Sequence, residues 1–293
     1  MTRGGFVALA GRPNVGKSTL VNAVVGEKVA IVSDRPQTTR RAIRGIDHSG
    51  ECEIVLVDLP GVQRPRDALT ARMARRVQQE LAGSDAALLM LNGEQGVGPG
   101  DRYIARTLAE APVPVTIAVN KVDRLSTASL MAVLTQAAEL DVGDAVFPIS
   151  ARRGQGVPEL MEHLRSLMPE GPFMYADGDL SDQSREVLVA ELIREAAIRR
   201  TFEEVPHAVE VAVEEVEGPH DGLMRVRALV WVETESQKGI LIGAGGRMVK
   251  AIGTAARREI ERALDCRVHL ELSVRVRRDW RGDEDLLDRL GIT

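Results

Sequence analysis

The chain has 293 residues, of which 44% are hydrophobic and 28% are charged, and its formal net charge is −5. This length favours two domains, each large enough to bury its own core. The composition excludes a polycation and a collagen-like chain, and the two cysteines, Cys52 and Cys266, are too few for a disulfide framework. Apolar runs stay well short of the roughly 20 residues of a membrane span, and the start has no signal-peptide core, so we expect a cytoplasmic protein with reduced thiols.

The first predicted strand, Phe6–Ala10, leads directly into a glycine-rich loop. Residues 11–18 read GRPNVGKS and match G-x-x-x-x-G-K-[ST], and helical spacing follows. Backbone N–H groups of such a loop surround a phosphate chain, and the helix N-terminus adds its positive dipole. We predict that Lys17 reaches the β- and γ-phosphates and that the Ser18 hydroxyl binds Mg²⁺. The predicted phosphate-binding residues are Gly11, Arg12, Pro13, Asn14, Val15, Gly16, Lys17, Ser18 and Thr19.

A polar, turn-rich segment, KVAIVSDRPQTTRR, covers residues 28–41. Such a segment can order around a γ-phosphate and relax after its loss. Thr38 and Thr39 are candidates for a second Mg²⁺ hydroxyl, and we favour Thr39. Arg40 is either a phosphate contact or a solvated side chain, and we favour the solvated side chain.

The next apolar run, Ile54–Val57, ends in the tetrapeptide DLPG. A strand ending in D-x-x-G places its carboxylate beside Mg²⁺ and its glycine N–H near a γ-phosphate. The predicted residues here are Asp58, Leu59, Pro60 and Gly61. Ras-like GTPases have a water-orienting Gln directly after this motif, whereas this chain has Val62, so we expect slow intrinsic hydrolysis. Residues 68–82 are then expected to form an amphipathic helix with Arg72, Arg75 and Arg76 exposed.

Two further apolar runs, Val115–Val119 and Ala145–Ile149, precede a predicted base site. Asp123 can accept hydrogen bonds from guanine N1 and the exocyclic amine, a pair that adenine does not offer. Asn120 would brace the loops, the Lys121 stem would cover the base, and the N–H of Ala151 would reach guanine O6. The predicted base-site residues are Asn120, Lys121, Asp123, Ser150, Ala151 and Arg152.

These four loops each follow an apolar run, in the order phosphate, Mg²⁺, base, base. That order is typical of an open α/β fold with a mostly parallel sheet, helices on both faces and a nucleotide at the carboxyl edge. The predicted ligands are GTP or GDP with Mg²⁺. Asn14 is a candidate ligand for a monovalent cation, K⁺, and the alternative is a loop cap. The predicted catalytic residues are Lys17, Thr39, Asp58 and Gly61, and the predicted Mg²⁺ ligands are Ser18, Thr39 and Asp58.

The pattern changes after residue 181. The predicted elements are a helix over Ser184–Thr201, strands over Ala208–Val213 and Met224–Val232, a short helix, a glycine loop, a second helix and a strand over Arg267–Val276. Residues 238–281 carry eleven basic and five acidic side chains. A G-x-x-G turn between helices clamps a nucleic-acid backbone in KH modules, so we predict an α+β RNA-binding domain. The alternative is a domain that packs only on protein. The predicted RNA-binding residues are Lys238, Gly243, Ala244, Gly245, Gly246, Arg247, Lys250 and Trp280, whereas Trp231 is expected in the core.

We therefore predict a GTP-binding domain over 1–170, a linker over 171–181 and a KH domain over 182–293. Three other interpretations remain: a GTP-regulated RNA-binding module whose hydrolysis is only a slow reset, a ribosome-assembly GTPase with two tandem G domains, and a signalling GTPase with a protein-binding second domain. The single phosphate loop argues against tandem G domains. Whether RNA accelerates turnover separates the first of these from an enzyme that uses GTP hydrolysis as its switch.

Over essentially its whole length the chain resembles the Era family of bacterial GTPases. GRPNVGKSTLVNAVVG, RPQTTRR, DLPG, NKVD and SAR look like its GTPase domain, and REVLVAELIREAAI, the GAGG loop and VRVRRDWRGDEDLLDRLG look like its type II KH domain. The sequence departs from the family pattern at Leu59, usually Thr, and in the uncharged GAGG loop. The resemblance implies a monomer that binds the 3′ end of 16S rRNA during small-subunit assembly, with some peripheral membrane association.

Overall fold

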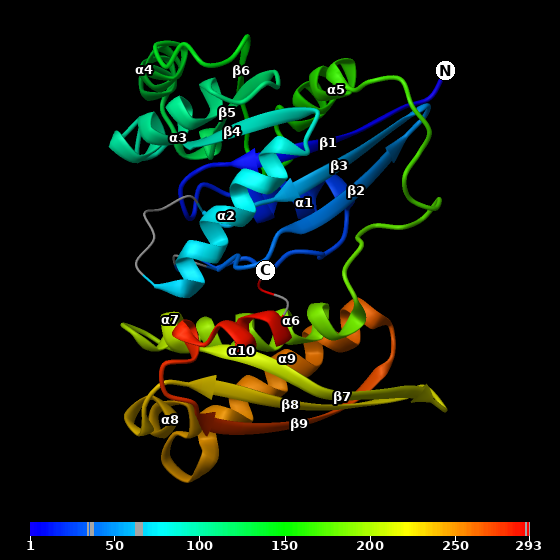
Figure 1. Cartoon of the computed structure of the whole chain (residues 1–293), viewed down its shortest axis with the longest axis vertical. Coiled ribbons are helices and arrows are strands. Elements are labelled where there is room, and N and C mark those ends of the chain that lie inside the picture. The colour runs from blue at the N-terminus through cyan, green and yellow to red at the C-terminus, as the bar shows by residue number, and fades with distance from the viewer. Residues whose placement is uncertain (34, 36–37, 62–66, 291, 293) are drawn as a thin grey trace.

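The computed structural model describes all residues except 34, 36, 37, 62–66, 291 and 293. Figure 1 shows two domains joined by an extended connection. The first contains β1 (Arg3–Ala10), α1 (Lys17–Val25), β2 (Ile43–Ser49), β3 (Cys52–Asp58), α2 (Ala68–Ala82), β4 (Ala86–Asn92), α3 (Pro99–Ala109), β5 (Val115–Asn120), α4 (Thr127–Ala138), β6 (Ala145–Pro148) and α5 (Val157–Leu167). The second contains α6 (Arg185–Ile198), α7 (Val205–Ala208), β7 (Glu210–His220), β8 (Leu223–Val232), α8 (Glu235–Ile242), α9 (Arg247–Leu264), β9 (Arg267–Val276) and α10 (Glu284–Arg289).

The first domain is built on a six-stranded sheet in the order β2-β3-β1-β4-β5-β6. All neighbouring pairs are parallel except β2 with β3. The predicted mostly parallel sheet is therefore confirmed. Because parallel strands share a direction, the loops after β1, β3, β5 and β6 emerge at one edge of the sheet.

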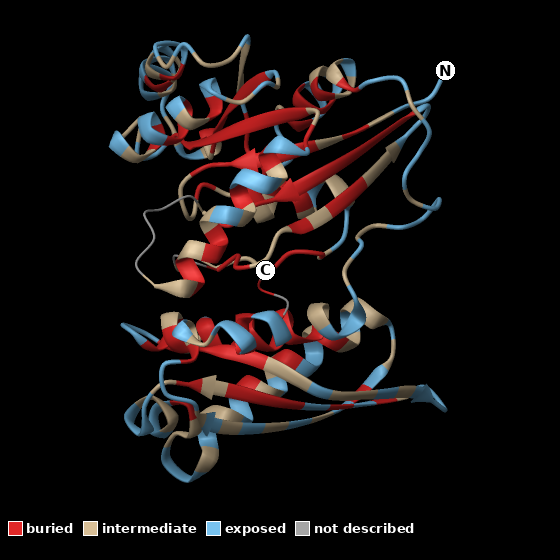
Figure 2. Ribbon diagram, viewed as in Figure 1, coloured by how far each residue is buried: buried red, intermediate tan, exposed pale blue. Residues whose placement is uncertain are grey.

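Helices cover both faces of this sheet, which explains why its central strands are apolar on both sides. On one face, side chains such as Leu9 and Leu56 pack with α1 and α5. On the other, Val57 and Leu89 pack with α2, α3 and α4. Figure 2 shows these central strands as buried along most of their length. The loops at the carboxyl edge are thus mounted on a rigid core.

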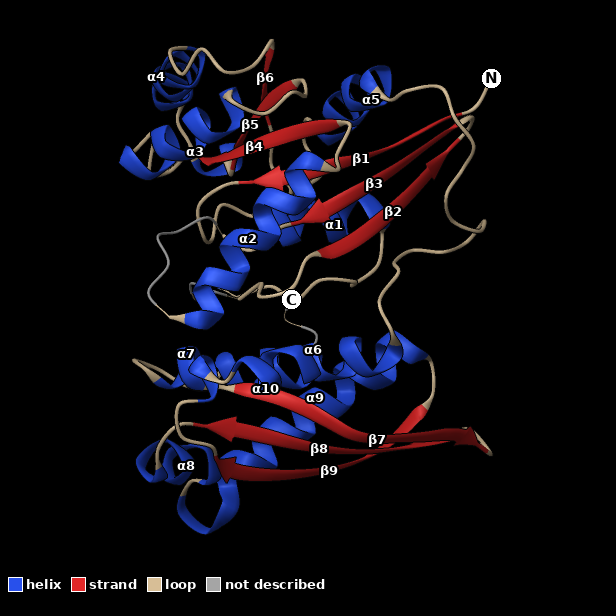
Figure 3. Cartoon of the chain, viewed as in Figure 1, coloured by secondary structure: helices blue, strands red, loops and turns tan. Residues whose placement is uncertain are grey.

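Residues 171–183, all of them described, form neither helix nor strand and run beside the first domain. Figure 3 shows this stretch as loop. The fully buried carboxylate of Glu53 accepts the N–H groups of Met174 and Tyr175 at 2.8 and 3.1 Å. The N–H of Ile46 donates to the carbonyl of Leu180 at 3.0 Å. The connection is therefore attached to the first domain at several points.

The second domain has a three-stranded sheet in the order β7-β8-β9, with β7 antiparallel and β9 parallel to β8. Helices α6 and α9 share its hydrophobic core, with Ile193 and Ile260 fully buried. A 3₁₀ turn over Ala244–Gly246 separates α8 from α9. The predicted order of helix, two strands, helix, glycine loop, helix and strand is confirmed. No helix in the described part of either domain has the length and apolar character that crossing a bilayer requires.

The domains are joined by buried ion pairs, and here the sequence prediction for Arg40 was wrong. Arg40 does not face solvent, since it is 2% exposed. Its guanidinium lies in the second domain, 2.7 Å from Glu210 Oε2 and within 2.7 and 2.8 Å of the carbonyl oxygens of Val209 and His207. Arg41 reaches Glu191 Oε1 at 2.6 Å. The loop before β2 is therefore an interdomain contact.

The C-terminal helix α10 makes a second contact between the domains. Its residues Leu286 and Leu287 share a core with Leu69 and Met73 of α2. The predicted exposure of Arg72 was wrong, because Arg72 is 8% exposed and pairs with Glu284 and Asp288. Helix α10 therefore packs on the first domain and covers one side of α2. Arg75 is exposed as predicted, and Arg76 is half-buried and pairs with Glu80 at 2.6 Å.

Candidate nucleotide and RNA sites

The glycine-rich loop between β1 and α1 closes tightly against the base side of the domain. Gly16, the N-cap of α1, has φ of 105°, a conformation that L side chains rarely adopt. A Cβ atom at this position would lie 2.2 Å from Asn120 Nδ2. Glycine is therefore required here on two grounds, backbone conformation and space.

The charged side chains of the loop point in different directions. Lys17 is 6% exposed, and its Nζ lies 3.4 Å from the carbonyl oxygens of Gly11 and Arg12. Burial lowers the pKa of Lys17, and the charge of Asp58 partly offsets that effect. Arg12 instead turns its guanidinium toward α3, with Nε 2.9 Å from Asp101 Oδ1. Lys17 is therefore placed to meet a phosphate, whereas Arg12 offers the site only its backbone.

Three side-chain oxygens from three separate segments meet beside the start of α1. Ser18 Oγ lies 2.5 Å from Asp58 Oδ2 and 3.2 Å from Thr39 Oγ1, and Thr39 Oγ1 lies 3.4 Å from the same carboxylate oxygen. The hydroxyl of Thr38 instead donates to the carbonyl of Arg35 at 2.6 Å. The structure thus brings together the three predicted Mg²⁺ ligands, and it distinguishes Thr39 from Thr38.

Asp58 is the one carboxylate of this group, and it is fully buried. Burial raises its pKa, while the charge of Lys17 and hydrogen bonds from Ser18 and Thr39 lower it. Its Oδ1 has no hydrogen-bond partner among the described residues. Mg²⁺ prefers oxygen ligands, typically one or two carboxylates together with hydroxyl, phosphate and water oxygens. The donor set therefore fits Mg²⁺, and an unpartnered carboxylate oxygen is available to it.

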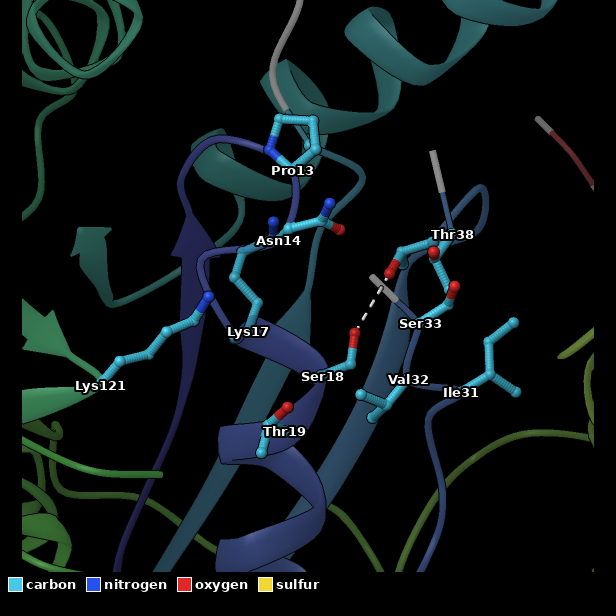
Figure 4. Close-up of a pocket in the computed structure, with 13 residues that line it drawn as sticks. Pro13, Asn14, Lys17, Ser18, Thr19, Ile31, Val32, Ser33, Thr38 and Lys121 are labelled. Atoms are coloured by element: carbon cyan, nitrogen blue, oxygen red, sulfur yellow. Dashed lines mark hydrogen bonds between the residues drawn. The ribbon is translucent and has the colours of Figure 1, made fainter. Parts of the chain in front are cut away.

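The pocket around these atoms is shown in Figure 4. Lys17, Ser18 and Thr19 enter it from α1, Ser33 and Thr38 lie across from Ser18, and Lys121 approaches from the base side. Gly61 also lines it, where a Cβ atom would come within 2.8 Å of Pro13 Cγ. Val62, on which the expectation of slow hydrolysis depends, lies outside the described residues.

The base-side loops are connected by Asn120. Its Nδ2 donates to the Val15 carbonyl at 2.8 Å, and its Oδ1 accepts the N–H groups of Lys121 and Ala151 at 2.8 and 2.9 Å. Asn120 therefore links three predicted loops, as a brace would. Because the N–H of Ala151 is engaged by Asn120, its predicted bond to guanine O6 requires that this N–H be shared or released.

Asp123 is oriented by a neighbouring hydroxyl. Ser150 Oγ donates to Asp123 Oδ1 at 2.7 Å, and Arg153 lies 3.4 Å from Oδ2. The hydrogen bond from Ser150 lowers the pKa of Asp123, and the charge of Arg153 adds to that effect. The carboxylate is thus ionised at neutral pH, as an acceptor for guanine must be. Arg153 was missed in the sequence, where it stands one position beyond SAR, and Arg152 is exposed.

The second glycine loop forms a projecting turn. Three glycines of this uncharged loop have positive φ, which other residues rarely adopt: 68° at Gly243, 60° at Gly245 and 77° at Gly246. The conformation of the loop therefore depends on glycine. The Ala244 carbonyl accepts Arg247 Nε at 3.2 Å. Arg247 and Lys250 are exposed on the first turn of α9, whereas Lys238 lies 3.9 Å from Glu235.

A groove of about 340 Å³ lies beside this loop, between α9 and the sheet-edge strand β9. Lys250 lines it, as do three residues that sequence reasoning missed: Gly253, Arg257 and His269. The sequence signal that could have pointed to this groove was a glycine, Gly253, inside a predicted helix. A Cβ atom at Gly253 would lie 3.5 Å from Leu272 Cδ1, an ordinary van der Waals contact, so the packing of α9 on β9 does not itself require glycine here.

Trp280 does not belong to this surface, and its predicted role in stacking on RNA bases was wrong. Trp280 is 0% exposed, and its Nε1 donates to the Ala208 carbonyl at 2.9 Å. The Arg40 guanidinium lies 5.3 Å from its ring centre. The prediction failed because the surrounding arginines suggested exposure, whereas α10 and α2 cover the indole. Trp231, expected in the core, is half-buried.

Comparison with known proteins agrees with both halves of this description. Residues 6–121 match the model of a 50S ribosome-binding GTPase, and residues 204–281 match that of a KH domain. GTPase Era of Mycobacterium bovis (strain BCG / Pasteur 1173P2) is 46% identical over 294 residues, covering 98% of each chain. GTPase Era of Mycobacterium avium (strain 104) is also 46% identical, over 99% of this chain and 98% of the relative.

Two solved structures match the whole fold. A crystal structure of Era in complex with MgGDPNP and nucleotides 1506–1542 of 16S ribosomal RNA has a TM-score of 0.96 at 31% identity, and a point variant of Aquifex aeolicus Era bound to GDP·AlF4⁻ has 0.94 at 32%. Each covers 100% of both chains. With the phosphate loop, the oxygen cluster and the glycine loop of the second domain in place, the chain belongs to the Era family of GTPases.

Proposed function

We propose that this GTPase binds GTP with Mg²⁺ and the 3′ end of 16S rRNA, and uses GTP hydrolysis as a switch during assembly of the small ribosomal subunit. The observation that carries the proposal is the convergence of Ser18, Thr39 and Asp58 in a chain whose second domain presents a glycine loop and groove. The full-length likeness to a relative solved with a GTP analogue and that RNA supports it. We assign residues 1–170 to the GTP-binding domain, 171–181 to the linker and 182–293 to the RNA-binding KH domain.

Five residues carry the GTPase chemistry in this proposal. Lys17 Nζ faces the β- and γ-phosphates, and Ser18, Thr39 and Asp58 hold Mg²⁺, Asp58 through water. When bound, Mg²⁺ neutralises charge that develops on the phosphate oxygens. The N–H of Gly61 donates to the γ-phosphate, which couples the segment after β3 to the presence of GTP. Asp123 selects guanine, because an ionised carboxylate accepts both N1–H and the exocyclic amine.

Several finer assignments belong to the same proposal. Asn14, at φ of 64° in the pocket wall, is assigned as the residue that would hold K⁺, whose charge would help to stabilise the phosphate groups. Val62 in place of a water-orienting side chain is assigned as the cause of slow intrinsic turnover. We also propose that the protein acts as a cytoplasmic monomer. Peripheral association with the membrane is proposed from the family resemblance alone.

The RNA is proposed to lie along the groove between α9 and β9. Backbone N–H groups of the glycine loop approach the phosphates, while Arg247 and Lys250 supply the cations that the loop lacks. Bases enter the groove beside Gly253 and His269. GTP can control this binding only if RNA affinity differs between the GTP and GDP states.

The test is RNA binding by fluorescence anisotropy, with a short strand that matches the 16S rRNA 3′ end and a scrambled strand as control. We expect tighter, sequence-selective binding with a non-hydrolysable GTP analogue than with GDP. Lys250→Ala should reduce the salt slope by about 0.7, as for one lost phosphate contact. Arg106→Ala, an exposed arginine on α3, should leave the slope unchanged. Equal affinity for both strands, or for both nucleotide states, would contradict the switch.

A further inference from the structure

The loop that carries Thr39 is held by the second domain on both sides of that residue. The carbonyl oxygen of Thr38, directly before it, accepts a hydrogen bond from Arg194 Nη2 of α6. Directly after it, Arg40 inserts its guanidinium among the carbonyl oxygens of His207 and Val209. Both neighbours of Thr39 are therefore anchored in a domain that contributes none of the predicted nucleotide ligands, Thr38 through its carbonyl oxygen and Arg40 through its side chain.

Arg194 is itself rigidly oriented. It is 0% exposed, and Glu191, one turn earlier on α6, accepts its Nε at 3.1 Å and its Nη2 at 2.5 Å. A two-point contact of this kind fixes the plane of the guanidinium as well as its position. Glu191 also accepts Arg41 Nη1 at 2.6 Å. The donor that meets the Thr38 carbonyl is therefore held in place from both domains.

We propose that Arg194, oriented by Glu191, is a positioning residue of the GTPase site: by holding the Thr38 carbonyl it keeps the Thr39 hydroxyl beside Ser18 and Asp58. This inference rests on the proposed function, in which Thr39 is a Mg²⁺ ligand in the GTP state. It assigns to the KH domain a direct part in forming the Mg²⁺ site.

A purely structural role for Arg194 makes a different prediction. An interface residue that only stabilises the fold would affect GTP and GDP binding alike. A positioning residue acts on the loop, and such a loop orders around the γ-phosphate and Mg²⁺ that only the GTP state presents. The effect of losing Arg194 should therefore be confined to the GTP state and should appear as a weaker dependence on Mg²⁺.

The first measurement is the Mg²⁺ concentration that half-saturates binding of a fluorescent non-hydrolysable GTP analogue to the full-length protein. In Arg194→Met we expect this concentration to rise about tenfold, the scale of loss when a group that orients a metal ligand is removed. GDP affinity should change less than twofold. Arg194→Lys keeps the charge and has its donors on a single nitrogen, so it cannot make the planar two-point contact, and its effect should fall between those of Arg194→Met and the wild type.

The second measurement needs no nucleotide. Amide hydrogen exchange at residues 39–43 should become about tenfold faster in Arg194→Met, because the anchor on the preceding carbonyl is gone. Glu191→Gln, a milder change, should shift exchange and Mg²⁺ dependence in the same direction. Its matched control is Glu259→Gln, which weakens another interdomain contact at the start of the same segment, 3.0 Å from Lys28 Nζ and eleven residues before Thr39. Glu259→Gln should change neither the amide exchange at residues 39–43 nor the Mg²⁺ dependence.

The outcomes separate this inference from the proposed function. A wild-type protein that binds the analogue without regard to Mg²⁺ would overturn the proposed function, before any variant is compared. Folded variants with wild-type Mg²⁺ dependence and wild-type exchange at 39–43 would overturn the positioning role alone. Equal loss of GDP and analogue affinity would overturn it as well. If Arg194→Met does not fold, Arg194→Lys and Glu191→Gln carry the same test.

Discussion

The carboxylate of Glu210 should be among the most sensitive positions for stability, because it lies where the two domains meet. It is 0% exposed, with Oε2 2.7 Å from Arg40 Nη1 and Oε1 3.4 Å from Arg41 Nη2. Burial alone would raise its pKa, but the charges of Arg41, Arg40 and Arg194 outweigh burial and lower the pKa to about 2. Burial lowers the pKa of Arg40 to about 10, so the pair remains charged at neutral pH.

The expected loss of unfolding free energy follows from the lowered pKa of Glu210. A fall from the ordinary 4.5 to about 2 corresponds to roughly 3 kcal/mol of free energy of unfolding at pH 7, at 1.36 kcal/mol per unit. Removing one partner of a buried ion pair typically costs about 3–5 kcal/mol. We therefore expect Glu210→Gln to lower the free energy of unfolding by about 3 kcal/mol at pH 7.

The pH dependence has a definite sign. The stabilisation from Glu210 is fully present above pH 4.5 and is lost as the pH falls from 4.5 toward 2, because the unfolded state binds the proton first. At pH 3.5 roughly 1.4 kcal/mol of it should be gone. The difference between the wild type and Glu210→Gln should therefore narrow as the pH is lowered through this range.

The assay is urea unfolding followed by circular dichroism, at pH 7 and at steps down to pH 3.5. Glu215→Gln is the matched control, since Glu215 pairs with Arg227 at 3.1 Å with both side chains solvent-exposed, and should cost less than about 0.5 kcal/mol. Arg40→Met combined with Glu210→Gln should cost less than the sum of the single changes, because no charge is then left without its partner. A loss for Glu210→Gln no larger than that of the control, or strict additivity, would refute the reasoning.

Three other changes test the two sites. Asp123→Asn should lose GTP affinity and gain affinity for xanthosine triphosphate in a competition assay, because the amide donates where the carboxylate accepted. Gly16→Ala should abolish GDP binding in a fluorescence titration, since its Cβ would meet Asn120 Nδ2 at 2.2 Å; retained binding would show that the loop can adjust. Trp280→Phe should cost about 1–3 kcal/mol of unfolding free energy, because the buried Ala208 carbonyl loses its donor, while RNA affinity in the anisotropy assay stays unchanged.

The nucleotide site could be predicted from the sequence because each of its motifs follows the strand that positions it. Asp58 directly follows one apolar run and the phosphate loop with Lys17 follows another, and parallel strands bring such ends to one edge. Arg40, Arg72 and Trp280 could not be placed in this way. Their burial depends on the second domain and on α10, and Arg72 and Glu284 are 212 positions apart. Periodicity reports which face of an element is polar, but it does not report which distant segment covers that face.

The segment 38–41 belongs to both domains, and that has a thermodynamic consequence. Thr39 faces Ser18 and Asp58, while its neighbours Arg40 and Arg41 are bound by the second domain. If Mg²⁺ and GTP order this segment, they must also favour the domain packing that it anchors. Coupling between binding events is reciprocal, so RNA that favours this packing must raise the affinity for GTP by the same factor by which GTP raises the affinity for RNA. Measuring both factors on one preparation tests the coupling directly, because unequal values cannot arise from a single linked equilibrium.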